Sequence, residues 1–146
     1  MIFIDNSNIF NGFQKYKVKA DYEKLKALIT KNRDLRGIFL YEGVVYPINP
    51  NKVKWYEDLK KNSDYIIRTS FDKRINNFET FEKKIDVKIA IDMVSFAYED
   101  LYDTAILVSG DGDFLPLIEK LKELNKNIEL WAFEYSLANV LKEEIN

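Results

Sequence analysis

The chain has 146 residues, of which 47% are hydrophobic and 14% aromatic, so its length and composition fit one domain with a substantial core. It carries a formal net charge of −2 and contains neither cysteine nor histidine. These absences exclude disulfide frameworks, Ser-His-Asp and Cys-His catalysis, and zinc sites with histidine ligands. Any hydrolytic chemistry must therefore use carboxylates, lysine, tyrosine or a metal ion held by oxygen atoms.

The charge balance and the hydropathy of the chain limit its partners. A protein with this small negative charge lacks a general basic footprint, so nucleic-acid binding needs local basic patches or metal ions that bridge carboxylates to phosphates. No apolar run reaches the roughly 18 residues of a membrane span, and the first residues do not resemble a signal peptide. We expect a cytoplasmic protein that does not bind membranes.

Apolar runs alternate with segments of helical periodicity along the chain. The apolar runs predict strands at 1–4, 37–46, 65–69, 104–109 and 128–133. The helical spacing predicts helices at 22–30, 52–61, 85–98, 114–124 and 137–144, with an irregular charged segment at 71–83. This alternation is typical of an α/β fold with a parallel sheet covered by helices on both faces. In such sheets, ligands bind beyond the carboxyl ends of the strands.

Polar side chains follow the first and the fourth predicted strand. Residues 5–8 read Asp-Asn-Ser-Asn, which fits either a cap for a helix beginning near Ile9 or part of a site. Residues 109–114 read Ser-Gly-Asp-Gly-Asp-Phe, which fits either a turn or a metal or phosphate site. Within that stretch, Asp113 is placed to cap the helix predicted from Phe114.

A third group of carboxylates lies on the predicted helix 85–98. At about 100° per residue, Asp86 falls inside the apolar arc of that helix, where an unpaired charge costs several kcal/mol, about 3–5 by mutational experience. It therefore needs a cation or a basic side chain opposite. Asp92 lies at the edge of the same arc and fits a boundary position as well as a functional one. Clustered carboxylates without histidine or cysteine select Mg²⁺ or Mn²⁺, ions that activate water against phosphodiesters.

Three motifs in this order resemble the NYN domain, a branch of the PIN-like metal-dependent ribonuclease superfamily. They are residues 3–8, residues 83–87 with Asp92 downstream, and residues 109–114; residues 131–141 also resemble the last strand and helix of the family. The resemblance extends over nearly the whole chain, taken as one domain of residues 1–146. It implies a three-layer α/β/α sandwich with parallel strand order 3-2-1-4-5. The family often has glycine where this chain has Ile85.

The resemblance also implies a function and its residues. It implies a ribonuclease that cleaves RNA with a Mg²⁺ or Mn²⁺ ion activating water, and a metal site formed by Asp5, Asp86, Asp111 and Asp113. In this hypothesis Asp5 and Asp111 bind the first ion. Asn8 would hold a ligand or a substrate phosphate, and Asp92 matches a downstream acidic position whose part in the site stays open.

Other residues are candidates for contacts with RNA. We expect Ser109 and Lys84 to bind substrate. The remaining candidates for phosphate contacts, each also readable as part of a solvated face, are Lys15, Lys17, Lys19, Lys73, Arg74 and Lys83. Tyr41 and Tyr46 fit either base stacking or ordinary packing at the end of a strand.

Two other functions stay open. One is a Mg²⁺-dependent phosphohydrolase with Asp5 as nucleophile, which the pattern disfavours because Ser7 stands where a second aspartate is usual. The other is a non-catalytic module that binds RNA or a protein partner. A toxin with a cognate antitoxin is a variant of the nuclease hypothesis, and the small size of the chain fits a homodimer or a protein partner.

Overall fold

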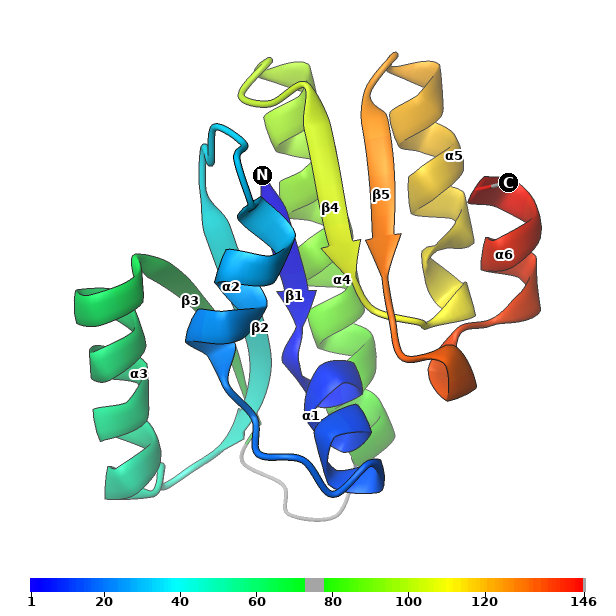
Figure 1. Ribbon diagram of the computed structural model, residues 1–146. Coiled ribbons are helices and arrows are strands. Elements are labelled where there is room, and N and C mark those ends of the chain that lie inside the picture. Colours follow the sequence, from blue (N-terminus) through cyan, green and yellow to red (C-terminus); the bar gives the residue numbers. More distant parts are fainter. Residues whose placement is uncertain (73–77, 146) are drawn as a thin grey trace.

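A computed structural model describes residues 1–72 and 78–145 of the chain (Figure 1). Among these residues, the strands are β1 (Ile2–Asp5), β2 (Ile38–Val45), β3 (Tyr65–Asp72), β4 (Thr104–Val108) and β5 (Asn127–Trp131). The α-helices are α1 (Asn6–Lys15), α2 (Tyr22–Thr30), α3 (Pro50–Ser63), α4 (Phe78–Tyr98), α5 (Leu115–Glu123) and α6 (Asn139–Ile145). Two short 3₁₀ helices are η1 (Gly112–Phe114) and η2 (Glu134–Ser136).

The five strands form one parallel sheet in the order β3-β2-β1-β4-β5, which confirms the predicted fold class and strand order. The chain passes from β1 outward to β2 and β3, and then crosses to the other side of β1 to form β4 and β5. The direction in which successive strands are added to the sheet therefore reverses between β1 and β4. Ligands of open parallel sheets bind at such a reversal, outside the carboxyl ends of the strands.

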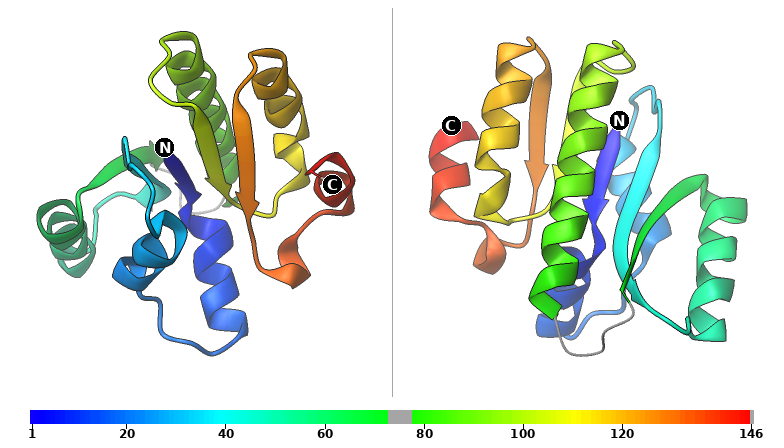
Figure 2. Two further views of the ribbon diagram at one scale, coloured as in Figure 1. Left: turned by 45° about the horizontal axis from the view of Figure 1, so that its top comes forward. Right: turned by 180° about the vertical axis from the view of Figure 1, so that it is seen from behind.

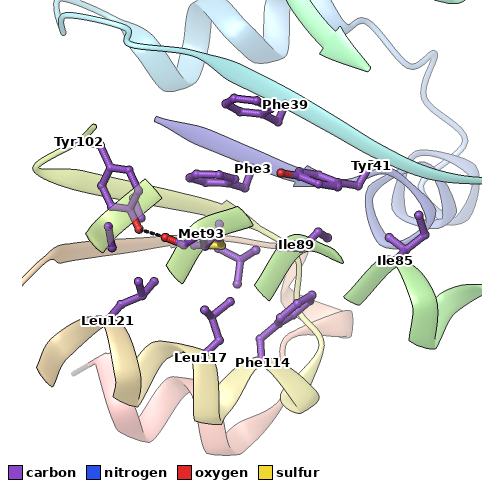
Figure 3. Close-up of a cluster of buried hydrophobic side chains, with 13 residues drawn as sticks. Phe3, Phe39, Tyr41, Ile85, Ile89, Met93, Tyr102, Phe114, Leu117 and Leu121 are labelled. Carbon is purple, nitrogen blue, oxygen red and sulfur yellow. Dashed lines mark hydrogen bonds between the residues drawn. The ribbon is translucent and has the colours of Figure 1, made fainter. Parts of the chain in front are cut away.

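Helices cover both faces of the sheet, as the apolar strands predicted. Alternate residues of β1 point to opposite faces: Phe3 joins one buried cluster, while Ile2 and Ile4 join the other. The Phe3 cluster lies under α4 and α5 and includes stacked rings of Phe3 and Phe39 with centroids 5.5 Å apart (Figure 3). The second cluster lies under α1, α2 and α3, on the opposite side (Figure 2).

The structure corrects part of the predicted secondary structure. Residues 71–83 were expected to be irregular, but β3 continues to Asp72 and α4 begins at Phe78, while residues 73–77 lie outside the described part of the chain. The sequence contains a signal for the earlier start of α4, because Phe78, Phe81 and Ile85 are spaced i, i+3 and i+7. The charged residues between them obscured this spacing.

Within residues 1–72 and 78–145, no helix combines the length and the apolar character needed to cross a bilayer.

Candidate functional site

Asp5 occupies the end of the central strand β1 and caps the helix that follows. Its Oδ1 accepts hydrogen bonds from the Ser7 hydroxyl at 2.9 Å and from the Asn8 backbone N–H at 3.3 Å. Its Oδ2 accepts a hydrogen bond from the Ser109 hydroxyl at 2.9 Å. The side chain is buried, with 3% exposure for the residue. The capping role predicted for this stretch is therefore confirmed, with the helix beginning at Asn6 rather than near Ile9.

The donors around Asp5 leave its charge uncompensated. Burial raises the pKa of the Asp5 carboxyl, hydrogen bonds from Ser109, Ser7 and Asn8 act in the opposite direction, and the charge of Asp111 raises it further. All three hydrogen-bond donors are neutral, and no lysine or arginine of the described residues lies within ion-pairing distance of Asp5. A buried carboxylate in this state attracts a cation from solution, because burial without a counter-charge is costly.

The loop after β4 is fastened against the first turn of α1. Ser109 is completely buried, and its hydroxyl accepts a hydrogen bond from the Asp111 backbone N–H at 3.3 Å while donating to Asp5. The Gly110 N–H donates to the Asn8 side-chain oxygen at 3.1 Å. Ser109 and Asn8 therefore connect the ends of β1 and β4, and they bring Asp111 close enough to Asp5 for their charges to repel.

A third loop closes over Gly110. The Gly110 carbonyl accepts a hydrogen bond from the Ala138 N–H at 3.0 Å, so the segment after η2 contacts the β4 loop. A Cβ atom at Gly110 would overlap the Ser136 carbonyl oxygen and lie 2.7 Å from its carbonyl carbon. Only glycine fits this approach of two backbones. The site is thus framed by the segments that follow β1, β4 and β5.

The capping role expected for Asp113 belongs to Asp111. The prediction that Asp113 caps the next helix is wrong: Asp111 is the N-cap of η1 and accepts a hydrogen bond from the Asp113 N–H at 2.9 Å. Helix α5 then begins at Leu115 without a side-chain cap. The Asp113 side chain is exposed at the surface of the site, whereas Asp111 is half-buried and faces the charge of Asp5.

Asp92 has partners from neighbouring strands. The Tyr41 hydroxyl donates to its Oδ2 at 2.8 Å, and the Arg68 Nε lies 3.5 Å from the same oxygen without hydrogen-bond geometry. Burial, and then Asp92 itself, raise the pKa of Tyr41. Asp92 therefore balances its charge inside the protein, which fits a structural role. Asp86 lies six residues earlier on α4, half-buried beside buried Ile85, and Lys84 is exposed on the same turn.

Of the four predicted metal ligands, the structure brings Asp111 close enough to Asp5 for its charge to raise the pKa of Asp5. In the described chain, no three acidic side chains lie close enough to share one ion. The four aspartates therefore do not form one cluster, and Asp5 with Asp111 is the pair for which an interaction of charges is found. This pair still fits Mg²⁺, because that ion is usually held by one or two carboxylates together with water and substrate phosphate oxygens. The hydroxyl and amide oxygens beside the pair complete an oxygen-only donor set.

The other predicted contacts are spread over the surface. Tyr41 is buried and Tyr46 exposed, and the Lys15 ammonium lies 3.8 Å from the centre of the Tyr135 ring. Lys17 and Lys19 are exposed beyond the end of α1. Lys73, Arg74 and the side chain of Lys83 lie outside the described part of the structure.

A large cavity beside the acidic pair was missed in the sequence. It has a volume of about 750 Å³ and lies between α1, the end of β2 and α3. Helix α1 lines it with Ser7, Phe10, Asn11 and Gln14, which are spaced i, i+3, i+4 and i+7 and so share one helix face. That spacing was the signal in the sequence for this cavity. It was missed because a helix face with Phe10 as its single large apolar residue does not stand out by hydrophobic periodicity.

Comparisons with known proteins agree with this architecture. A family model described as the NYN domain matches residues 1–145. The low amplitude and bright protein LabA of Synechococcus elongatus is 27% identical over 148 residues, covering 97% of this chain and 77% of that protein. A crystal structure of a protein of unknown function from Vibrio parahaemolyticus superposes with a TM-score of 0.80 at 21% identity, covering 97% of this chain and 85% of that one. The last likeness is one of fold.

Proposed function

The chain belongs to the NYN domain family, and on this basis we propose that it is a metal-dependent ribonuclease that hydrolyses phosphodiester bonds of RNA. NYN domains belong to the PIN-like nuclease superfamily and in general bind RNA, so the family supports a nuclease-type or RNA-related function. The proposal adds the catalytic step, the metal ion and the residues that hold it.

The observation that carries the proposal is the uncompensated carboxylate of Asp5. It lies at the carboxyl end of β1, beside the point where the strand order reverses, and within the described residues its hydrogen bonds come from neutral donors. Asp111 adds a second negative charge from the loop after the neighbouring strand. A protein gains no stability from placing these two charges together, which favours a role in holding a divalent cation.

The residues of the site have separate tasks in this proposal. Asp5 and Asp111 would hold Mg²⁺ or Mn²⁺, and Asp86 and Asp113 would bind outer water molecules or complete the site. When bound, the ion lowers the pKa of a water molecule and offsets the charge that develops on the phosphodiester. Ser7 and Ser109 fix the rotamer of Asp5 through their hydroxyl groups.

The neighbouring side chains position the substrate. Asn8 fixes the β4 loop through its bond to Gly110, so that Asp111 keeps its place opposite Asp5 when RNA enters. Ser109, expected to bind substrate, is completely buried and its hydroxyl bonds to Asp5 and to the Asp111 N–H, so it would act by holding these two residues in place rather than by touching RNA. The exposed ammonium of Lys84 would contact the RNA backbone, a contact that adds affinity without sequence preference.

Cleavage of labelled single-stranded RNA, duplex RNA and single-stranded DNA tests the proposal directly. Each substrate is incubated with Mg²⁺, with Mn²⁺ and with EDTA, using the wild type, Asp5→Asn and Asp111→Asn. We expect metal-dependent cleavage of RNA that both variants lose by about 100-fold or more, the scale seen when one stabilising group is removed from an active site. Asp100→Asn is the matched control, since Asp100 is exposed and paired with Lys126 away from the site.

A second candidate is a binding module that holds RNA without cleaving it. The observation that favours it is that, among the residues described, the acidic side chains do not assemble into a group of three or more. Binding of RNA by the wild type without cleavage in either metal would establish this second function and reject the catalytic proposal. Neither binding nor cleavage of any nucleic acid would reject both.

A further inference from the structure

The cavity beside the acidic pair has the size and the lining of a small-molecule site. Its volume of about 750 Å³ falls within the range of about 300–1,000 Å³ typical of small-molecule sites. Aromatic side chains of Phe10 and Trp55 line it, and so do the carboxamides of Asn11 and Gln14. Phe10 is 43% exposed on α1, and the half-buried Trp55 packs edge-on against Tyr22 with ring centroids 5.3 Å apart.

The charges in the cavity wall cancel. Glu42 and Lys52 are the charged residues among those that line it, and the Lys52 Nζ lies 2.5 Å from the Glu42 Oε1. The Tyr56 hydroxyl also donates to Glu42. A phosphate would need unpaired cations here, and a metal ion would need unpaired carboxylates. Neither is present in the lining that the structure describes, so the wall suits a neutral ligand with hydrogen-bonding edges.

The cavity borders the first turn of α1, directly after Asp5, because Asn6 and Ser7 line it. Ser7 lines the cavity and donates its hydroxyl hydrogen to Asp5, so one side chain belongs to both. Ile85, the residue before Asp86 on α4, also lines the cavity. A phosphate held at the acidic pair would therefore lie next to this cavity, because Ser7 contacts both.

We propose that this cavity binds one base of the RNA strand, that of a nucleotide adjacent to the bond that is cleaved. The inference rests on the proposed ribonuclease function and adds the subsite that fixes the position of the strand. The base packs against Phe10 and Trp55, since aromatic rings are general stacking partners of bases. Asn11 and Gln14 supply both donors and acceptors for its edge, as carboxamides do in base recognition.

The test uses a short labelled RNA in which one abasic position is moved stepwise along the strand. Binding is measured with Ca²⁺ in place of Mg²⁺, and cleavage is measured with Mg²⁺. We expect an abasic nucleotide to weaken binding by roughly 5- to 100-fold at one position next to the cleaved bond, the range for losing one stacked base, and far less elsewhere. Cleavage falls at that same position.

Substitution of Phe10 links that effect to the cavity. Phe10→Ala is expected to weaken binding of the intact RNA by a similar factor. It should not weaken further the binding of RNA that is abasic at the sensitive position, since the substitution and the missing base remove the same contact. Phe10→Trp keeps the aromatic face and retains binding. Tyr98→Ala is the matched control, an exposed aromatic residue outside the cavity, and leaves binding unchanged.

The possible failures separate the two proposals. If RNA is bound and cleaved in Mg²⁺ but no abasic position is sensitive, the base subsite is rejected and the nuclease remains. The base subsite is also rejected if Phe10→Ala weakens the binding of intact RNA and of abasic RNA equally. It is rejected as well if the cavity binds a free small molecule but not a base of the RNA. If RNA is neither bound nor cleaved, both proposals fall together.

Discussion

Asp5→Asn removes the charge of the buried carboxylate while its hydrogen bonds can be kept. With the amide oxygen directed at Ser7 and the Asn8 N–H, both bonds to Oδ1 remain. The amide nitrogen then faces Ser109, whose hydroxyl rotates and accepts instead of donating. The substitution therefore relieves the desolvation of a charge, but it also removes the acceptor of the buried Ser109 hydroxyl hydrogen, whose oxygen already accepts from the Asp111 N–H.

We expect metal-free Asp5→Asn protein to be more stable than the metal-free wild type. Replacing a strained functional residue commonly adds about 0.5–2 kcal/mol. For a chain of this size, that corresponds to a rise in Tm of roughly 2–8 °C. Thermal unfolding followed by circular dichroism in EDTA measures the shift. A second scan with Mg²⁺ should stabilise the wild type by mass action and leave Asp5→Asn unchanged.

A fall in Tm on Asp5→Asn in EDTA would refute this reasoning, because it would mean that the protein itself compensates the charge of Asp5. Asp100→Asn provides the contrast. Its hydrogen bond and ion pair with Lys126 lower the pKa of Asp100, so removing that charge should not raise Tm. A rise in both variants would indicate a general effect of net charge rather than burial.

Four other changes test particular parts of the site. Because burial raises the pKa of Asp5, the folded protein holds this proton more tightly than the unfolded chain does. The protonated Asp5 carboxyl contributes stability that is fully present below the unfolded-state pKa and is lost as the pH rises through the folded-state pKa. Denaturant titrations in EDTA should therefore show the stability advantage of Asp5→Asn over the wild type growing over that pH interval. Gly110→Ala should lower the free energy of unfolding by about 1–3 kcal/mol because it forces two backbones apart, and it should reduce cleavage. Gly112→Ala, whose Cβ would meet the Ala138 side chain at 3.1 Å, should lower the free energy of unfolding less in the same denaturant titration. Tyr41→Phe should cost about 1.5–3 kcal/mol in unfolding free energy because Asp92 loses a buried partner, and unchanged Mg²⁺ affinity by calorimetry would show that Asp92 is no ligand. Gly12→Ala places a Cβ inside the Phe133 ring, so despite the roughly 1 kcal/mol helix preference for alanine we expect a lower Tm.

The fold could be predicted from the sequence because its strands and helices carry strong local signals. Residues 38–41 are all apolar and all buried, as expected for a parallel strand covered on both faces. The strand order came from the resemblance of three motifs to a family, since alternation alone does not determine which strands are neighbours. The start of α4 was missed because charged residues between Phe78 and Ile85 hide an otherwise regular spacing.

The candidate site could be predicted only in part. The proximity of Asp5 and the 109–113 loop follows from parallel strands ending at one edge, and the structure brings Asp111 there. Which aspartate caps η1 depends on the backbone conformation at Asp111, and the pattern Asp-Gly-Asp does not encode that choice. The partners of Asp92 come from β2 and β3, far away in the sequence, so no local pattern could reveal them.

The neutral donors around Asp5 distinguish a site for an external cation from an ordinary buried ion pair. A lysine at position 7 or 109 would offset part of the cost of burying the carboxylate, but it would also occupy the place that a metal ion needs. The serine hydroxyls fix the same rotamer without supplying charge, and Asp111 increases the negative potential further. If the proposed ion binds here, we expect stability to be lower in the metal-free protein and to be recovered on binding, the relation that holds when burial serves function rather than folding.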